Sequence, residues 1–426
     1  MHKIVRSILG VAMIFGCTQA MAAEWDVSAD LRERYQFFNN LDFNSAVDNN
    51  SWEFDSRLYI KAKADFGNGL SVFLQPQAVH ILNHTTTDTQ NFTQADLLQA
   101  YLQYDVSGFG VRVGRQQLVY GDQRLLGHLG WKDVARTFDG MKVFYKDDAF
   151  KVDAFAVHPA DIGAMTPSAA SPQGESLVTW EDRRLMGVYG TYTVAPKTGM
   201  DVYLINWYHG DGASVGAGRS INTYGARGFG KWGGVDTVLE TAFQSGKWAK
   251  GVTQSASAYA VKAGYTFDMW KTRVGIEYDY SPGDATPGAG DHKDFVFPFH
   301  TNHAHYGEMD RFSWANMRDI RLSLKTSPLK GLTFKGNVHF LSLDKATGDW
   351  LNVVGAGKLF AGNPAYTSKD AGTEIDLKII YKVAAVKGLT LVANYSIFNP
   401  GKAVAERNGG KSDAASFGYV LASYKF

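Results

Sequence analysis

The stretch Trp52–His80 reads WEFDSRLYIKAKADFGNGLSVFLQPQAVH, and its side chains alternate in character along almost its whole length. From Trp52 to Phe66 every second residue is apolar or small, whereas the residues between them are almost all charged. Because successive side chains of a strand point to opposite faces, this strand has one apolar and one charged face. Gly67-Asn68-Gly69 follows as a hairpin turn in which glycine supplies positive φ, and a second alternating strand runs to His80.

The charged face covers residues 53–65, which is long for a soluble β-sandwich and too charged for a protein core. A hairpin of this kind is typical of a membrane barrel, where the apolar face meets lipid and the polar face meets water in the lumen. We therefore predict an all-β fold, namely a closed antiparallel transmembrane β-barrel.

The N-terminus has the features of a secretory signal peptide. Lys3 and Arg6 precede an apolar run, and Ala20-Met21-Ala22 has the small-x-small form of a cleavage site. We expect residues 1–22 to be removed and residues 23–426 to form one barrel domain. A lipoprotein signal at Cys17 is the less favoured alternative, because Phe15 fits that signal poorly.

The composition agrees with a barrel and gives no sign of a strongly charged partner. Removing Lys3 and Arg6 from the 43 basic residues leaves 41 against 42 acidic ones, a net charge of −1, so we expect no nucleic-acid partner. After the signal there is no apolar run of about 18 residues that could form a membrane helix. The 21 Tyr, 26 Phe and 10 Trp residues suit the interfacial girdles of a barrel.

The alternation recurs along the chain, weakly at 199–209 and 221–231, and gives about 18 strands, an even number as a closed bacterial barrel requires. Besides the hairpin, the expected strands are 26–37, 95–106, 109–118, 138–146, 149–157, 182–195, 199–209, 221–231, 234–245, 256–267, 271–281, 317–326, 331–343, 373–383, 388–398 and 415–426.

Short and long connections alternate between these strands, as in outer-membrane barrels with short periplasmic turns and long extracellular loops. Both chain ends are then expected in the periplasm, and the last strand ends on the aromatic Phe426. The expected long loops are about 38–51, 81–94, 118–137, 158–181, 210–220, 246–255, 282–316, 344–372 and 399–414.

Three segments carry a resemblance to a known family. They are GRQQLVYGDQRLLG at 114–127 followed by FDG at 138–140, FPFHTNHAHYGEMD at 297–310, and EIDL at 374–377. Together they resemble the signature segments of the alginate export family of outer-membrane barrels. The resemblance implies an 18-stranded barrel in the outer membrane, with a narrow, positively charged lumen that passes an anionic polysaccharide or similar acidic solute.

Basic residues on the polar strand faces are the candidates for contact with such a solute, although acidic residues share these faces. Arginine suits carboxylate recognition because its planar fork donates two parallel hydrogen bonds. The pore-lining residues that we predict are Arg32, Arg34, Arg57, Lys61, Arg112, Arg115, Asp122, Arg124, Arg136, Asp139, Arg273 and Arg321. Further bases on polar faces are Lys63, Lys142, Lys151, Lys262, Lys325, Lys335 and Lys378.

We expect the 118–137 loop to fold inward as a constriction that places Asp122, Arg124, Arg136 and Asp139. The alternative is that pairs such as Arg124–Asp139 only pin the loop, as ion pairs commonly do in barrel loops. Arg115 is out of phase with the polar face of its strand, so we expect it at a bulge, at the rim or on the turn into the loop.

One feature departs from the family pattern. Alginate secretion porins carry a long periplasmic loop after strand sixteen that plugs the pore, whereas here the corresponding turn is about 384–388. This difference argues against plug gating of that kind and against alginate as the specific cargo.

Other chemistry finds little support. His300, His303 and His305 with Glu308 include zinc-type ligands, but loop packing is the simpler explanation, so we predict no metal or other cofactor. No catalytic triad spacing or phosphate-binding glycine loop is present, so we expect no enzyme. The leading hypothesis is a monomeric channel in outer-membrane lipid that passes an anionic solute or alginate-like polysaccharide by diffusion. A periplasmic export partner is compatible with this hypothesis. The alternatives are a general porin of low selectivity, or an adhesion or assembly scaffold with a closed pore.

Overall fold

The computed structural model describes residues 23–83, 92–160, 183–210, 218–297, 299–352 and 358–426, so the expected signal peptide lies outside the described residues. Within this part of the chain, eighteen strands form one antiparallel sheet. The strands of the sheet are β1 (Glu24–Asn39), β2 (Ser51–Asp65), β3 (Leu70–Leu82), β4 (Phe92–Val106), β5 (Phe109–Gln116), β6 (Phe138–Lys146), β7 (Phe150–Pro159), β8 (Arg183–Ala195), β9 (Thr198–His209), β10 (Ser220–Trp232), β11 (Val235–Ala249), β12 (Val252–Thr266), β13 (Arg273–Ser281), β14 (Met317–Leu329), β15 (Leu332–Ser342), β18 (Asp370–Lys382), β19 (Leu389–Pro400) and β20 (Ala415–Lys425).

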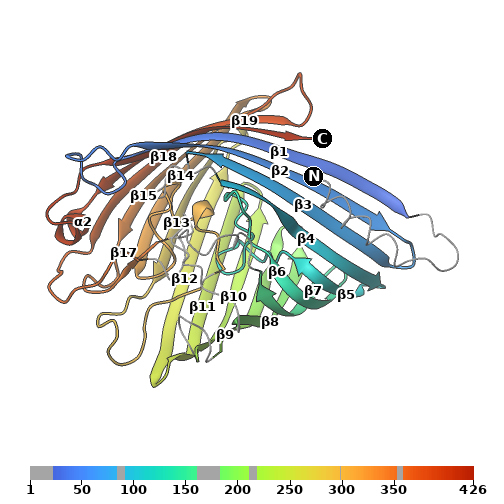
Figure 1. Ribbon diagram of the computed structural model, residues 1–426, viewed down its shortest axis with the longest axis horizontal. Coiled ribbons are helices and arrows are strands. Elements are labelled where there is room, and N and C mark those ends of the chain that lie inside the picture. The colour runs from blue at the N-terminus through green and yellow to red at the C-terminus, as the bar shows by residue number, and fades with distance from the viewer. Residues whose placement is uncertain (1–22, 84–91, 161–182, 211–217, 298, 353–357) are drawn as a thin grey trace.

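The sheet closes on itself because its first and last strands pair with each other. β1 pairs along one edge with β2 and along the other with β20, where Leu31 lies opposite Tyr424 and Phe37 opposite Gly418. Figure 1 shows the resulting barrel, in which the blue first strand lies beside the red last strands. The predicted closed antiparallel barrel of 18 strands is therefore confirmed.

Alternation along β2 separates the outside of the barrel from its interior. Trp52 and Ile60 are exposed on the outer surface, whereas Glu53, Asp55 and Arg57 are buried inside. On the outer surface aromatic rings pair near the strand ends, as for Phe109 and Tyr145, whose ring centroids lie 4.5 Å apart. An apolar outer belt with aromatic rims is what a bilayer requires of a barrel.

The turn between β2 and β3 uses left-handed backbone at three successive residues. Gly67, Asn68 and Gly69 have φ values of 72°, 49° and 86°. A side chain at Gly69 would overlap the carbonyl oxygen of Asp105, at 2.2 Å from the added carbon. The glycine-rich turn predicted from the sequence is therefore confirmed, and close packing against the next hairpin adds a second need for glycine.

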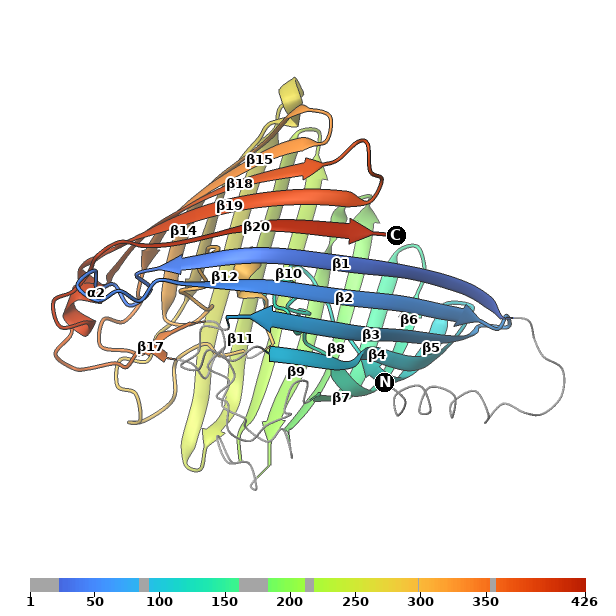
Figure 2. The ribbon, with the colours of Figure 1, turned by 45° about the horizontal axis from the view of Figure 1, so that its top comes forward.

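The two ends of the barrel differ. Short turns and the C-terminus lie at one end, and the long connections lie at the other (Figure 2). At the long-loop end are the short hairpin of β16 (Trp350–Leu351) and β17 (Lys358–Phe360) and the helix α2 (Lys402–Arg407), whereas the 3₁₀ helix η2 (Asn302–Ala304) lies inside the barrel, where the carbonyl of Ala304 accepts from Arg321 on β14. Among the described residues, no helix is both long and apolar enough to cross a bilayer.

Some strand bounds differ from the predicted ones for local reasons. β13 begins at Arg273 rather than at 271, because Met269–Lys271 form the 3₁₀ helix η1. β9 and β10 form fully. Their alternation in the sequence is weak because part of their inner face is apolar as well as their outer face. Ile205, Trp207 and Ile221 are buried inside the barrel, where Trp207 contacts the loop residue Phe299.

The orientation of alternate residues leads to a prediction for the middle of β14, where Leu322 is exposed on the outer face and the next residue, Ser323, lines the interior. We expect Leu322→Arg to reduce the free energy of unfolding by about 2–4 kcal/mol, because it places a charge against hydrocarbon. Ser323→Arg is the matched control and should cost much less. Urea titration in lipid vesicles, followed by tryptophan fluorescence, measures both, and equal losses would contradict the assigned faces.

Candidate functional site

Two long loops fold back into the barrel and pack against each other; we call residues 117–137 and 282–316 together the plug. Backbone bonds join them, since the amide of Gly127 donates to the carbonyl of Phe299 and the amide of Thr301 donates to that of Gln123, at 2.9 and 3.0 Å. Arg136 strengthens the joint by donating to the carbonyls of Gly127 and His300. The predicted inward fold of the 118–137 loop is therefore seen, but a second loop shares the constriction.

The wall formed by β1 and β2 holds the plug through three arginines. Arg34 donates to both carboxylate oxygens of Asp133, at 2.9 and 3.0 Å, and Arg32 binds the same carboxylate. Arg57 donates to the carbonyls of Gly130 and Lys132, at 3.0 and 2.9 Å. These arginines are buried and hold residues 130–133, and Arg34 also binds Asp55 on β2, at 2.8 Å.

The opposite wall holds the plug through the reverse arrangement of charge. Arg124 comes from the plug, is only 2% exposed, and lies between the carboxylates of Glu277 and Asp279 on β13. Arg321 on β14 binds the other oxygen of Glu277 and donates to plug carbonyls. Asp122 completes the contacts of the plug by binding Arg227 on β10.

The plug therefore spans the lumen between a cationic wall and an anionic wall. Burial alone would raise the pKa of Asp133, but the charges of Arg34, Arg32 and Arg57 outweigh it and keep the pKa below its usual range. Breaking a buried ion pair on one side leaves an uncompensated charge, which typically costs about 3–5 kcal/mol. Such contacts fix the plug firmly.

The structure places the twelve predicted pore residues in different roles. Six of them hold the plug, namely Arg32, Arg34, Arg57, Asp122, Arg124 and Arg136. Arg112 binds Gln103 on the neighbouring strand, and Lys61 is exposed near the turn end of β2. Arg273 and Arg321 line a cavity described below.

The pair Arg124–Asp139, considered from the sequence as a pin for the loop, is not formed. Asp139 instead binds Arg115, at 2.8 and 2.9 Å, and Arg115 also approaches Asp96. Arg115 and Asp139 alternate with Val113 and Met141, both exposed on the outer surface, in register along β5 and β6. This pair therefore lies on the outer face near the end of two short strands, consistent with the phase break seen in the sequence.

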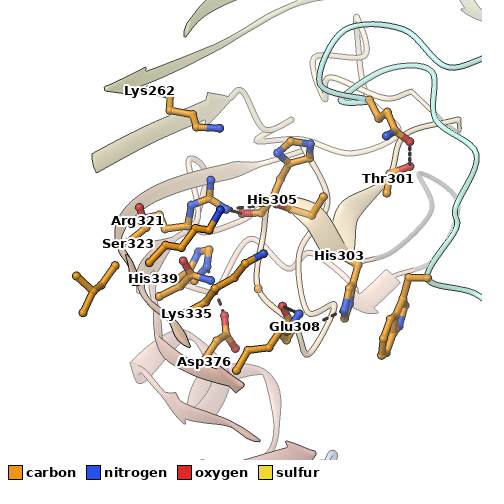
Figure 3. A pocket seen from close by; sticks show the side chains of 18 of the residues that line it. Lys262, Thr301, His303, His305, Glu308, Arg321, Ser323, Lys335, His339 and Asp376 are labelled. Carbon is orange, nitrogen blue, oxygen red and sulfur yellow. Dashed lines mark hydrogen bonds and ion pairs between the residues drawn. The ribbon is translucent and has the colours of Figure 1, made fainter. Parts of the chain in front are cut away.

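A cavity of about 700 Å³ lies between the plug and the inner faces of β11–β15 and β18 (Figure 3). We call it the vestibule. Its lining strand residues are close to the short turns, since Arg273 is the first residue of β13 and Lys335 is near the start of β15. Four adjacent strands each contribute one cation to a row in direct lateral register. The cation row consists of Arg273, Lys325, Lys335 and Lys378.

The ends of the cation row have partners and its middle does not. Arg273 binds Asp236 through two bonds of 2.8 and 2.7 Å, and Lys378 binds Glu308 of the plug. Within the described ranges, Lys325 and Lys335 have no ion-pair partner. Like charges directly opposite each other destabilise a sheet, so this row is kept against a structural cost. The vestibule is thus a place where an anion would be stabilised.

The cation row is an unbroken run of positive side chains, whereas the next level is mixed in sign, although Lys262 there also forms no ion pair among the described residues. Nearer the long loops, Lys262, Glu277 and Arg321 lie side by side on adjacent strands, and beyond them Asp279 lies opposite Asp319. The sequence had placed the lysines of the vestibule on polar faces but did not distinguish them from other bases. Strand alternation contains no information on which residues of neighbouring strands lie opposite each other.

The histidines of the 297–310 segment do not converge on one point. His305 bonds the carbonyl of Asp122 at 2.7 Å, and His300 bonds the carbonyl of Phe297. His303 lies between Glu308 and Asp310, at 2.9 and 3.2 Å, and its ring stacks on that of Trp131 with centroids 4.0 Å apart. His303 therefore joins the two loops of the plug beside the vestibule.

We expect Arg124→Met to loosen the plug, because it leaves Asp279 buried without its cation, at a cost of about 3–5 kcal/mol. Single-channel conductance in planar bilayers should rise relative to the unmodified protein. Arg112→Met is the matched control, since Arg112 binds the neutral side chain of Gln103 and lies over the ring of Tyr101, with no carboxylate partner among the described residues. An unchanged conductance in Arg124→Met would contradict the role of this residue.

A second prediction concerns pH. Burial lowers the pKa of His303, but Glu308 and Asp310 outweigh burial and raise it to about 9, while the pKa of Glu308 is lowered to about 2. The contacts of His303 are therefore complete below its unfolded pKa of about 6.5 and are lost as pH rises through about 9.

Conductance should accordingly increase with a midpoint near pH 9 in the unmodified protein. His303→Gln should remove this midpoint, whereas His128→Gln, which changes another histidine of the vestibule lining, should keep it. The same midpoint in both variants would show that another group titrates.

Comparisons with known proteins agree with this architecture. The family described as alginate export matches residues 24–417. Among solved structures, OccAB3 of Acinetobacter baumannii is similar with a TM-score of 0.63 and 11% identity, covering 95% of this chain and 99% of that chain. OccK8 (OprE) of Pseudomonas aeruginosa has a TM-score of 0.63 and 13% identity, covering 95% and 98% of the two chains.

OccK5 (OpdH) of Pseudomonas aeruginosa has a TM-score of 0.62 and 11% identity, again covering 95% of this chain and 98% of that chain. At such low identity these likenesses show the fold alone. A comparison with curated proteins finds no match. The family match extends over most of the closed barrel, so the protein is an outer-membrane channel and belongs to the alginate export family.

Proposed function

We propose that the channel passes anionic solutes, acidic saccharides in particular, by diffusion and without catalysis. The observation that carries this proposal is the cation row of the vestibule, whose central Lys325 and Lys335 form no ion pair among the described residues. The arginines of the β1–β2 wall carry less weight, because Asp133 already occupies two of them.

The row suits transport better than tight binding. Each cation by itself holds an anion weakly in water, and neighbouring weak sites let an anion move from one to the next. Because Arg273 and Lys378 are already paired, the vestibule does not bind an anion as tightly as four free cations would. A solute with carboxylates on successive units could contact several positions of the row at once.

The constriction of this channel differs from the periplasmic plug of alginate secretion porins. The turn between β18 and β19 covers only residues 383–388, and the lumen is instead filled by loops from the opposite end of the barrel. We infer that the cargo belongs to the acidic class without being alginate itself. We further infer that the channel acts as a monomer, with any export partner meeting it at the periplasmic turns.

The test removes the unpaired charges. We expect Lys325→Gln with Lys335→Gln to lower the anion-to-cation permeability ratio by roughly five- to thirtyfold, since each unit charge near an ion in water contributes about 0.5–1 kcal/mol and the two together about 1–2 kcal/mol. The reversal potential across a planar bilayer under a salt gradient measures this ratio. Lys330→Gln is the control, because Lys330 lies in the turn between β14 and β15, outside the vestibule lining.

The same recording separates the competing functions. Conductance without anion preference in the unmodified protein would favour a general porin. An absence of conductance would favour a scaffold with a closed pore. Either result would overturn the proposed function.

A further inference from the structure

Lys378 has two neighbours of different kinds, and this connects the vestibule to the plug. Along the sheet it lies opposite Lys335, which forms no ion pair within the described residues but is attracted by the charge of Glu308. Toward the lumen its ammonium binds Glu308, which belongs to the plug and is nearly buried. Lys378 is thus the only member of the cation row, among the described residues, whose ion-pair partner comes from the plug.

Glu308 connects Lys378 to the rest of the plug. Its carboxylate binds His303 at 2.9 Å, and the ring of His303 stacks on Trp131 (Figure 3 shows the bond between His303 and Glu308). Trp131 in turn lies under the guanidinium of Arg34, 4.2 Å from its ring centre, and its carbonyl accepts from the same arginine. One chain of contacts therefore runs from the vestibule across the plug to the β1 wall.

The backbone around Glu308 is held in place, so the carboxylate cannot simply follow Lys378 if that lysine turns away. Gly307 has φ of 95°, and an added side chain there would overlap the carboxylate of Glu374. The amide of Met309 donates to the same carboxylate at 2.9 Å. Both neighbours of Glu308 are thus packed against β18, so the side chain has little freedom to move.

We propose that Lys378 and Glu308 form a latch that an anion bound on the cation row opens, so that cargo in the vestibule loosens the plug. This inference rests on the proposed function. An oligo-anion with two or more carboxylates that occupies Lys325 and Lys335 lies beside Lys378 and competes with Glu308 for it. Glu308 then keeps His303 as its remaining cation and faces the negative charge of the cargo, which weakens the joint between the two loops.

Anion binding and loosening of the plug are thermodynamically linked. If the anion loosens the plug by some factor, loosening the plug must raise the affinity for the anion by the same factor. Coupling between two sites typically changes affinity by about 5–150-fold, and we expect roughly tenfold for a single shared cation. The latch therefore predicts a change in binding as well as a change in gating.

The experiment uses trigalacturonate, which has three carboxylates, as the probe, and maltotriose as a neutral probe of similar size. Glu308→Gln removes the competitor for Lys378. Binding of trigalacturonate, measured by calorimetry on the full-length protein in detergent, should tighten roughly tenfold. In planar bilayers the same variant should show more frequent openings before any probe is added, and the probe should increase them no further. Maltotriose should have no effect on either protein.

Lys378→Gln breaks the same ion pair from the wall side and distinguishes a latch from a folding defect. It should also open more often without probe, but its affinity for trigalacturonate should fall, because the row has lost a cation. A folding defect would move binding in the same direction in both variants. Opposite shifts in binding with equal shifts in baseline opening are therefore the expected result.

Unchanged binding and unchanged probe-induced opening in Glu308→Gln would overturn the latch. That failure is separate from failure of the proposed function. If Lys325→Gln with Lys335→Gln still lowers anion preference while Glu308→Gln changes nothing, the channel is anion-selective without a latch. If the unmodified protein shows no anion preference and does not bind trigalacturonate, both proposals fall.

Discussion

Every charge that this barrel buries in its lumen needs an opposite charge, and this constraint decides where the loops lie. On the inner wall, Arg34 binds Asp55 of β2, but the three buried arginines of β1 and β2 outnumber the two buried carboxylates beside them, Glu53 and Asp55, whereas β13 presents the buried carboxylates Glu277 and Asp279. Asp133 and Arg124, from one loop, supply the missing partners on the two sides. The plug thus neutralises charges of both signs on the wall, so that the interior can be filled without leaving them buried and unpaired.

What the plug leaves unfilled is equally informative. Its charges match the wall at the level of Glu277 and Arg321, but it does not reach Lys325 and Lys335 nearer the turns. The lumen therefore has two levels: one where Glu277 is bound by Arg124 and Arg321, and one where cations remain for a solute. Glu308 stands at the boundary between them, because it belongs to the plug and binds a lysine of the vestibule.

The fold could be predicted from the sequence because the bilayer imposes a simple rule on each strand separately. Trp52 and Asp55 differ in parity, and parity alone assigns one to lipid and the other to the lumen. The rule weakens where the plug replaces water, as at Ile205 and Trp207, whose apolar side chains blur the alternation of β9. Partners of lumen charges could not be predicted in this way. Arg124 meets β13 rather than Asp139 only because the loop folds across the barrel, and the cation row exists only because four strands happen to lie in that register.

The pairing of β1 with β20 has a consequence for how the molecule is built. These strands come from opposite ends of the chain, so the wall cannot be sealed until synthesis is complete. The plug already links early strands to late ones, since its 117–137 segment binds Arg34 on β1 while its 282–316 segment, through Glu308, binds Lys378 on β18. A plug that folds before sealing raises the effective concentration of the two edges for each other. Such a plug would hold β1 and β20 close together, so that the last step of barrel closure is hydrogen bonding between two neighbouring strands.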